Sequence, residues 1–419
     1  MSRFRVTGGR ELEGTIDVSG AKNAVLPVMA ATLLTSDKVV LEDVPNLLDV
    51  SVMSDVLESL GGKIIKKGNK LTISVKEIES IETPYDLISK MRASIVIMGP
   101  MLARKGRVRI SHPGGCAIGS RPINWHLKGL EALGAEIRMD HGFLDVSAQQ
   151  LKGTKIYLDF PSVGATENIM MAASAAVGTT IIENSAQEPE IVELANFINE
   201  IGGKIRGAGT NVINIEGVKE FHGTTHTIIP DRIEAGTYIL IAAACGGEVL
   251  VRNVIHAHLQ PLLAKLNEAG IVYRAEDDAI RVIGKGNYNA VDVKTQVHPG
   301  FPTDLQAPFV ALLSKAKGTA MVTENIFENR FMHVEELKRM GANIKIEGRS
   351  AIIKGEENLN AATVAASDLR AGASLILAGL IANGTTEIRN IYHIDRGYEK
   401  IVEKLNAIGA DIVRISAPE

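Results

Sequence analysis

The stretch 111–122 combines the residue types that are best suited to chemistry in this sequence. It places Cys116, one of only two cysteines, five residues before Arg121, among three glycines and two prolines. Gly and Pro at this density break regular structure, so the sequence predicts a surface loop between a strand over 107–110 and a helix that begins near Ile123. A nearby guanidinium favours a thiolate and binds anions. The alternative interpretation is that Cys116 is a small buried hydrophobe, and the loop alone leaves the two interpretations nearly even.

The composition describes an ordinary soluble protein and narrows the choice of partners. The 419 residues are 45% hydrophobic and 22% charged, enough for two domains with full cores. A net charge of −4 gives no basic footprint, so we expect no nucleic-acid partner. No apolar run approaches the length of a membrane helix and no signal pattern opens the chain, so we expect a cytoplasmic protein without a membrane partner. Cys116 and Cys245 lack zinc-ligand spacing, so we expect no metal.

A short glycine motif occurs six times along the chain. Each copy ends a charged amphipathic helix with an apolar residue, a glycine and a further small or apolar residue. The glycines are 68 to 73 residues apart, at Gly61, Gly134, Gly202, Gly270, Gly341 and Gly409. Each glycine suits the left-handed position just past a helix end. In phase with them, apolar helices that we expect to be buried are predicted over 24–34, 93–103, 169–177, 236–244, 307–314 and 372–381. A strand is predicted after each, over 38–41, 107–110, 179–182, 248–251, 319–322 and 385–388.

The two ends of the chain complement each other. The sixth repeat stops early, and the segment 11–18 matches 150–157, which belongs to the part that the sixth repeat lacks. We therefore expect residues 1–21 to pair with the C-terminal strands, giving one closed domain at 22–229 and a second made of 1–21 plus 230–419. The alternative is a linear solenoid, which tends to carry atypical caps at both ends.

Charged residues gather where the apolar helices begin. Acids there are routine helix caps, but cations are unfavourable at a helix N-terminus unless an anion lies beside them. A cation nevertheless precedes four of the predicted helices, namely Lys22, Arg92, Arg232 and Arg370. We therefore expect a polyanionic ligand in a cleft between the two domains, with solvated caps as the alternative. The chain contains neither GxGxxG nor GxxxxGK[ST], so a Rossmann or P-loop nucleotide site is not predicted.

The segments that carry these residues resemble those of the enolpyruvyl transferase family over essentially the whole chain. The matching segments are 19–24, 113–122, 162–166, 301–306, 328–331 and 368–372. The resemblance implies an α/β fold of two inside-out barrels, each made of three βαβ-type repeats around buried central helices. The cysteine-bearing loop separates the chain from the family member that acts on shikimate 3-phosphate, because that enzyme lacks it.

The resemblance also implies a reaction. The enolpyruvyl group of phosphoenolpyruvate would pass to the 3′-hydroxyl of UDP-N-acetylglucosamine, through a tetrahedral ketal and without a metal or cofactor, as the first committed step of peptidoglycan synthesis. Asp304 corresponds to the base, and Cys116 to the proton donor, which can also form a phosphothioketal with phosphoenolpyruvate and be alkylated by fosfomycin. The corresponding cations are Lys22, Arg121 and Arg396 on phosphate, with Arg330 and Arg370 nearby.

The nucleotide sugar would lie mostly against the first domain. The matching positions are Asn23, Arg92, Arg121, Pro122, Ile123, Asn124, Trp125, Ser162, Val163 and Gly164, with Asp304 and Ile326 from the second domain. Asn124, Trp125 and Phe160 depart from the residues that are common in the family. Two alternatives stay open, a catalytically silent relative that binds nucleotide sugar and regulates a partner, and a sister transferase that acts on another hydroxyl.

Overall fold

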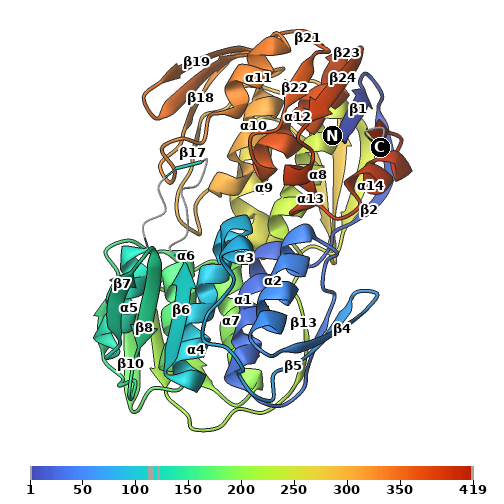
Figure 1. Ribbon diagram of the computed structural model, residues 1–419. Helices are drawn as coiled ribbons and strands as arrows, with labels where there is room; N and C mark the ends of the chain where they lie inside the picture. Colours follow the sequence, from blue (N-terminus) through green and yellow to red (C-terminus); the bar gives the residue numbers. More distant parts are fainter. Residues whose placement is uncertain (1, 112–117, 120–122, 417–419) are drawn as a thin grey trace. The chain divides into compact units, whose positions relative to one another are not determined.

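The computed structural model describes residues 2–111, 118–119 and 123–416, apart from the side chains of 88–90 and 92–94. Contacts between residues divide the chain into two units (Figure 1). One, here the 20–229 unit, consists of Gly20–Gly115 and Arg121–Ile229; the other, the 230–419 unit, consists of Met1–Ser19, Cys116–Ser120 and Pro230–Glu419. No helix in the part of the chain that the structure describes is both long and apolar enough to cross a bilayer.

Three buried helical segments form the centre of each unit. In the 20–229 unit they are α1 (Lys22–Ala31) continued by η1 (Thr32–Leu34), η2 (Arg92–Ile97) with α4 (Met98–Lys105), and α6 (Val163–Ala173). In the 230–419 unit they are α8 (Arg232–Cys245), η4 (Thr303–Leu305) with α10 (Gln306–Leu313), and α12 (Leu369–Ile381). Apolar side chains on every face make these helices suited to burial all round, as predicted. Most begin earlier than their apolar runs, because polar residues occupy the first turn.

Outer helices and small sheets surround each centre. The outer helices are α2 (Leu48–Ser59), α3 (Tyr85–Lys90), α5 (Asn124–Ala132) and α7 (Pro189–Glu200) in the 20–229 unit, and η3 (His256–Leu259) with α9 (Gln260–Glu268), α11 (His333–Arg339), α13 (Tyr392–Asp395) and α14 (Ile401–Ala407) in the 230–419 unit. Most sheets have four strands, of which three are antiparallel neighbours from one repeat.

The sheets of the 20–229 unit follow the order of the repeats. Their strand orders are β13 (Thr225–Thr227), β3 (Val39–Glu42), β5 (Lys70–Ser74), β4 (Lys63–Lys67); β6 (Arg107–Ser111), β8 (Phe143–Ser147), β7 (Glu136–Asp140); and β11 (Lys204–Arg206), β12 (Val212–Glu216), β10 (Thr179–Glu183), β9 (Lys155–Tyr157). Strand β13 ends the third repeat and pairs in parallel with β3 of the first, with Thr225 opposite Val40. A linear solenoid lacks such a pairing.

The sheets of the 230–419 unit include the N-terminal strands. Their orders are β15 (Val272–Glu276), β16 (Ala279–Gly284), β14 (Gly247–Arg252), β2 (Leu12–Asp17); β17 (Val293–Lys294), β18 (Thr319–Thr323), β20 (Ser350–Lys354), β19 (Asn343–Glu347); β22 (Thr363–Ala365), β24 (Thr385–Arg389), β1 (Arg3–Thr7), β25 (Asp411–Ile415); and the pair β21 (Leu359–Asn360), β23 (Ala382–Asn383). Strand β1 lies between β24 and β25 and is antiparallel to both, which confirms the predicted pairing with the C-terminal strands.

The prediction is wrong for β2, which pairs in parallel with β14 of the fourth repeat, Leu12 opposite Gly247. The reason lies in the repeat itself. Each closing strand belongs to the sheet of the following repeat, as β9 pairs with β10 and β13 with β3. The segment 1–21 therefore completes the sixth repeat through β1 and adds to the fourth through β2.

Candidate active site

Asp304 lies between two buried arginines at the start of a central helix of the 230–419 unit. Its Oδ1 accepts a hydrogen bond from Nη2 of Arg330 at 2.7 Å, and its Oδ2 accepts from Nη2 and Nε of Arg370 at 3.0 and 3.2 Å. The arginine side chains are 5% and 3% exposed, whereas that of Asp304 is 26% exposed. One carboxylate therefore joins two guanidinium groups and keeps part of its surface open.

This pairing sets the charge of the cluster. Burial alone would raise the pKa of Asp304, but the charges of Arg370 and Arg330 outweigh it and hold that pKa well below the ordinary value. The carboxylate is therefore ionised at neutral pH. Burial lowers the pKa of the neighbouring His333 to about 4, so this imidazole is neutral and adds no charge. The cluster has a net charge of +1.

Further polar side chains hold Arg330 in place. Its Nη1 donates to Oγ1 of Thr303 at 2.8 Å, and that hydroxyl donates to Oε2 of Glu324, a residue 1% exposed. The other oxygen of Glu324 accepts the backbone N–H of Ile326 at 2.8 Å, which ties this predicted site residue to the same network. Nε of Arg330 and Nη1 of Arg370 are buried without a hydrogen-bond partner among the described residues. Both guanidiniums thus keep an unused donor, which is costly in a protein interior.

Arg396 lies on the neighbouring outer segment, at the C-terminal end of α13. Arg396 is half-buried. Burial of His393 lowers the pKa of that ring most, and the positive charge of Arg396 lowers it further. Arg370 reaches toward the same segment, because its guanidinium stands 5.4 Å from the ring centre of Tyr398.

Lys22 opens α1 in the 20–229 unit and is also paired. Its Nζ lies 2.8 Å from Oδ2 of Asp49 on α2, and the two side chains are 11% and 3% exposed. The next residue, Asn23, is exposed. The cation at this helix start is therefore balanced by the protein's own carboxylate, as Arg370 is by Asp304. The cations at these helix starts therefore do not by themselves require an anionic ligand, which weakens one reason for predicting a polyanion.

The start of α6 brings another predicted group together. Ser162 caps the helix by accepting the N–H of Ala165, and Val163 and Gly164 form the first turn, all partly open to solvent. A Cβ on Gly164 would lie 3.0 Å from the ring of His126, so glycine lets α5 and α6 approach closely here. The side chain of Asn168 fixes His126 through its Nδ1 at 2.8 Å.

An aromatic pair stands beside this turn. Trp125 and Phe160 stack with ring centres 5.3 Å apart and an interplanar angle of 21°. Trp125 is the second residue of α5, after the exposed Asn124, and Ile123 is the buried N-cap of the same helix. In the sequence Phe160 stands out only as a departure from the family, and its stacking on Trp125 has no sequence signal because the two residues are 35 positions apart.

Four predicted site residues lie wholly or partly outside the described part of the chain. Cys116, Arg121 and Pro122 fall in the undescribed segments of the 111–122 loop. The backbone of Arg92 begins η2, but its side chain is not described. Other partners had no sequence signal at all, notably Asp49, Thr303 and Glu324, since each is defined only by a long-range contact.

Comparisons with known proteins identify the class. A family model described as EPSP synthase (3-phosphoshikimate 1-carboxyvinyltransferase) matches residues 6–405. The crystal structure of the enolpyruvyl transferase NikO from Streptomyces tendae superposes with a TM-score of 0.91 at 24% identity over 100% of this chain and 99% of that one. EPSP synthase from Acinetobacter baumannii gives 0.76 at 18% identity over 99% and 100%. The chain therefore belongs to the EPSP synthase family of enolpyruvyl transferases, and the predicted fold is confirmed.

Relatives at high identity narrow the class further. The chain is 58% identical over 413 residues to UDP-N-acetylglucosamine 1-carboxyvinyltransferase 1 of Caldanaerobacter subterraneus subsp. tengcongensis, covering 99% of both chains. It is 57% identical over 418 residues to UDP-N-acetylglucosamine 1-carboxyvinyltransferase 2 of Carboxydothermus hydrogenoformans, covering 99% of this chain and 100% of the relative. A third relative, from Halalkalibacterium halodurans, is 54% identical over 421 residues, covering 100% and 96%. The prediction of a transferase similar to these enzymes is confirmed.

Proposed function

We propose that the chain transfers the enolpyruvyl group of phosphoenolpyruvate to the 3′-hydroxyl of UDP-N-acetylglucosamine and releases inorganic phosphate. The observation that carries the proposal is the full-length identity of 54–58% to enzymes with that transferase name. The cations at the starts of the buried helices support it, because both substrates are multiply charged anions. The product would enter peptidoglycan synthesis in the cytoplasm and so support cell shape and division.

The reaction balances in two steps. In the addition, the sugar oxygen attacks C2 of phosphoenolpyruvate, its proton passes to a base, and an acid protonates the methylene carbon. The tetrahedral ketal that results carries the phosphate on the same carbon. In the elimination, a proton leaves the new methyl group and phosphate departs, which restores the double bond as an enol ether. The residues must therefore supply a base, an acid and cations.

Asp304 is the proposed base. Its low pKa keeps it ionised at neutral pH, but makes it a weak proton acceptor while both arginines bind it. Its side chain is 26% exposed, so one face remains accessible to a hydroxyl. If a guanidinium turns from Asp304 to a substrate carboxylate, the stabilisation of the charged form falls and the carboxylate becomes more basic. Substrate binding would then activate the base.

The cations are proposed to hold the two anionic ends of phosphoenolpyruvate. Arg330 and Arg370 suit its carboxylate, because each has a buried N–H without a partner among the described residues that a substrate anion could satisfy. Lys22, Arg121 and Arg396 are proposed for phosphate. Cys116 is the proposed proton donor to the methylene carbon and the residue that forms the phosphothioketal.

The start of α6 is proposed for the nucleotide sugar. Its first turn presents backbone N–H groups and the positive end of the helix dipole, which suit a diphosphate. The stacked rings of Trp125 and Phe160 beside it offer an aromatic surface for a base. The remaining proposed contacts are Asn23, Arg92, Arg121, Pro122, Ile123, Asn124 and Ile326. Trp125 is the only tryptophan, so its fluorescence reports binding at this place.

A phosphate-release assay tests the proposal. Inorganic phosphate should appear only when phosphoenolpyruvate and UDP-N-acetylglucosamine are both present, and should not appear when shikimate 3-phosphate replaces the nucleotide sugar. Quenching of Trp125 by UDP-N-acetylglucosamine without any phosphate release would instead favour the silent, nucleotide-sugar-binding relative. Release with another acceptor only would favour a sister transferase.

Mass spectrometry tests the role of Cys116 separately. Incubation with fosfomycin and UDP-N-acetylglucosamine should add one inhibitor mass to the protein, and the Cys116→Ala variant should gain none. The same variant should lose turnover at neutral pH, but UDP-N-acetylglucosamine should still bind to it and quench the fluorescence of Trp125. Full activity of Cys116→Ala would remove it from the mechanism.

A further inference from the structure

Two of the places where the chain passes from one unit to the other lie side by side. They are Ser19–Gly20 and Ile229–Pro230. Within the 20–229 unit, the N–H of Ala21 donates to the carbonyl of Ile229 at 2.7 Å, and within the 230–419 unit, the N–H of Asp231 donates to the carbonyl of Ser19 at 2.9 Å. The two crossing segments therefore form one short, paired element.

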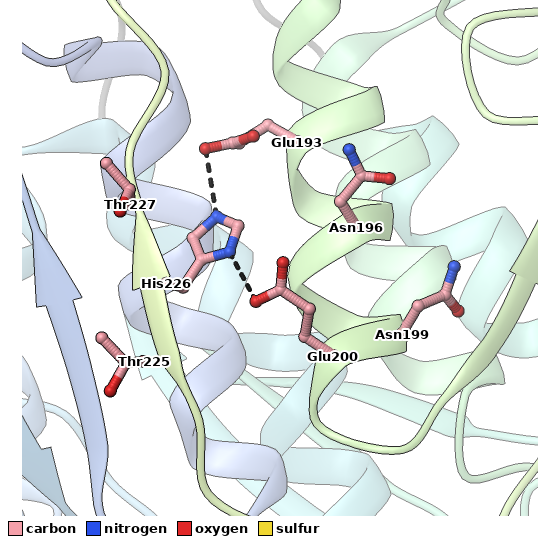
Figure 2. A pocket seen from close by; sticks show the side chains of 7 residues that line it. All are labelled: Glu193, Asn196, Asn199, Glu200, Thr225, His226 and Thr227. Atoms are coloured by element: carbon pink, nitrogen blue, oxygen red, sulfur yellow. Dashed lines mark hydrogen bonds and ion pairs between the residues drawn. The ribbon is translucent and has the colours of Figure 1, made fainter.

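A buried glutamate holds this element in the 20–229 unit. Oε1 of Glu193, on α7, accepts the backbone N–H of Ile229 at 3.0 Å, and the same oxygen lies 3.1 Å from Nε2 of His226. The other ring nitrogen of His226 lies 2.8 Å from Oε2 of Glu200, about two helical turns after Glu193 on α7 (Figure 2). A neutral imidazole has one N–H, so only the imidazolium donates to both carboxylates.

The 230–419 unit holds its crossing in the same way but with a different cation. Glu234 accepts the N–H of Ser19 at 2.7 Å, the Tyr238 hydroxyl at 3.0 Å and Nζ of Lys404 at 2.7 Å. Each crossing is thus fixed by a buried carboxylate, paired with histidine in one unit and with lysine in the other.

We propose that Glu193, His226 and Glu200 are positioning residues for the transferase reaction, forming a clamp on the Ile229 crossing that loosens as the pH rises. This inference rests on the proposed function, because Ala21, which is bonded to Ile229, directly precedes the proposed substrate-binding residues Lys22 and Asn23. The pKa of His226 is raised above the ordinary value of 6.5, so this ring loses its proton as the pH rises past that value. Loss of the proton leaves Glu193 buried without its cation, which weakens its hold on Ile229.

The surroundings of His226 support a proton that is held but exchangeable. Burial lowers its pKa, but the hydrogen bonds and charges of Glu193 and Glu200 outweigh burial and raise the pKa above 6.5. On the neighbouring strand β3, Leu41 lies opposite His226, and the next residue, Glu42, is bound to Lys70. Phe197 of α7 packs edge-on against the ring at 5.4 Å. The stretch before β13 adds the exposed His222, and the N–H of Gly223 donates to Asp37, which lies just before β3.

An open groove gives water access to the clamp. It has a volume of about 690 Å³ and is lined by Glu193, Asn196, Asn199, Glu200, Thr225, His226 and Thr227 (Figure 2). Glu193 and His226 are 4% and 6% exposed at its floor, while the side chain of Glu200 is 44% exposed. The proton of His226 can therefore exchange with solvent on the side of the ring that faces the exposed Glu200.

The direction of the pH effect follows from the raised pKa. The protonated clamp is complete below the ordinary histidine pKa of 6.5 and is lost as the pH rises through the higher value in the folded protein. Crossing segments that are less fixed must be ordered when substrate binds, so the KM for the nucleotide sugar should rise with pH while kcat changes less.

The test compares His226→Gln with wild type and with His222→Gln, which removes an exposed histidine four positions away. Wild type and His222→Gln should show a KM for UDP-N-acetylglucosamine that rises about three- to tenfold from acid to alkaline pH, the range expected for losing one ordinary hydrogen bond. His226→Gln should have the alkaline KM at every pH. A KM profile of His226→Gln that matches wild type would overturn the proposal.

A second measurement keeps the clamp testable if the proposed reaction fails. The Tm of wild type should fall relative to His226→Gln as the pH rises, and the ring signals of His226 should titrate at the same pH. Absence of phosphate release with a pH-dependent Tm difference would overturn the proposed function and leave the clamp supported. Phosphate release with no Tm difference and no titration above 6.5 would overturn the clamp alone.

Discussion

The two units each contain a cluster of three charged side chains, and the clusters have opposite compositions. In the 230–419 unit one carboxylate, Asp304, lies between two arginines, and in the 20–229 unit one imidazole, His226, lies between two carboxylates. Burial opposes the charged form of the central group in both, and in both the flanking charges outweigh it. The pKa of Asp304 is therefore lowered and that of His226 raised.

This difference in charge suits one cluster to binding a substrate and the other to holding the backbone in place. The arginine-rich cluster has excess positive charge, unused donors and a partly open carboxylate, which suit an anionic substrate. The glutamate-rich cluster has excess negative charge, and its Glu193 accepts the backbone N–H of Ile229. Only the second cluster is poised to change its charge near neutral pH, because a carboxylate with a lowered pKa stays ionised there.

The largest effect should come from Asp304→Asn. The amide retains the shape of the side chain but cannot take the hydroxyl proton, so kcat should fall by about 10²- to 10⁴-fold. The measurement is phosphate release, with Trp125 quenching to confirm that the nucleotide sugar still binds. Asp277→Asn, in the exposed turn between β15 and β16, should retain full activity. A kcat for Asp304→Asn close to that of this control would place Asp304 outside the chemistry.

Lys22→Met should reduce stability, by about 3–5 kcal/mol in the free energy of unfolding, because the buried carboxylate of Asp49 would lose the ammonium group that lies 2.8 Å from it. Urea denaturation measures this loss. The matched control is Lys204→Met, which breaks a surface pair whose side chains are 58% and 61% exposed and should cost less than about 1 kcal/mol. Replacing Asp49 by leucine in the Lys22→Met background should restore part of the stability. Equal losses for Lys22→Met and Lys204→Met would contradict a buried pair.

Phe160→Leu should weaken nucleotide-sugar binding by a smaller amount, about two- to tenfold in Kd, because the aromatic pair is lost and Trp125 remains. Quenching of Trp125 gives the Kd directly. Phe143→Leu, which removes a ring that packs with Arg109 on another sheet, serves as the control. An unchanged Kd for Phe160→Leu would show that this pair does not contact the base.

The smallest effect should come from Glu200→Gln. It removes the more exposed of the two carboxylates that raise the pKa of His226, so the titration of that ring should move to lower pH. The KM rise should move in the same direction, because less alkaline solutions would then remove the proton. Histidine NMR measures the first and a KM profile the second. A titration that stays where it is in wild type would mean that Glu193 alone sets the charge state.

Local patterns made much of the fold predictable. The glycine motifs and apolar runs predicted the position of every buried helix and of every strand that follows it, because the same hydrophobic pattern occurs six times along the chain. Acids at helix starts were interpreted as caps, which is confirmed for Asp231 and Asp368, whose side chains accept N–H groups of α8 and α12. Asp304 differs, since it binds two arginines instead.

The sequence by itself determined the periodic elements, the family and the residue types suited to phosphoenolpyruvate and a nucleotide sugar, since these depend on local order along the chain. Only the tertiary structure decided which charges meet. Lys22 with Asp49, Asp304 with Arg330 and Arg370, and β2 with β14 are pairs between distant segments. Their partners depend on how the repeats pack, and burial then sets the pKa of each group. The same packing turned Glu193 and His226, which carry no motif, into a support for the crossing between the units.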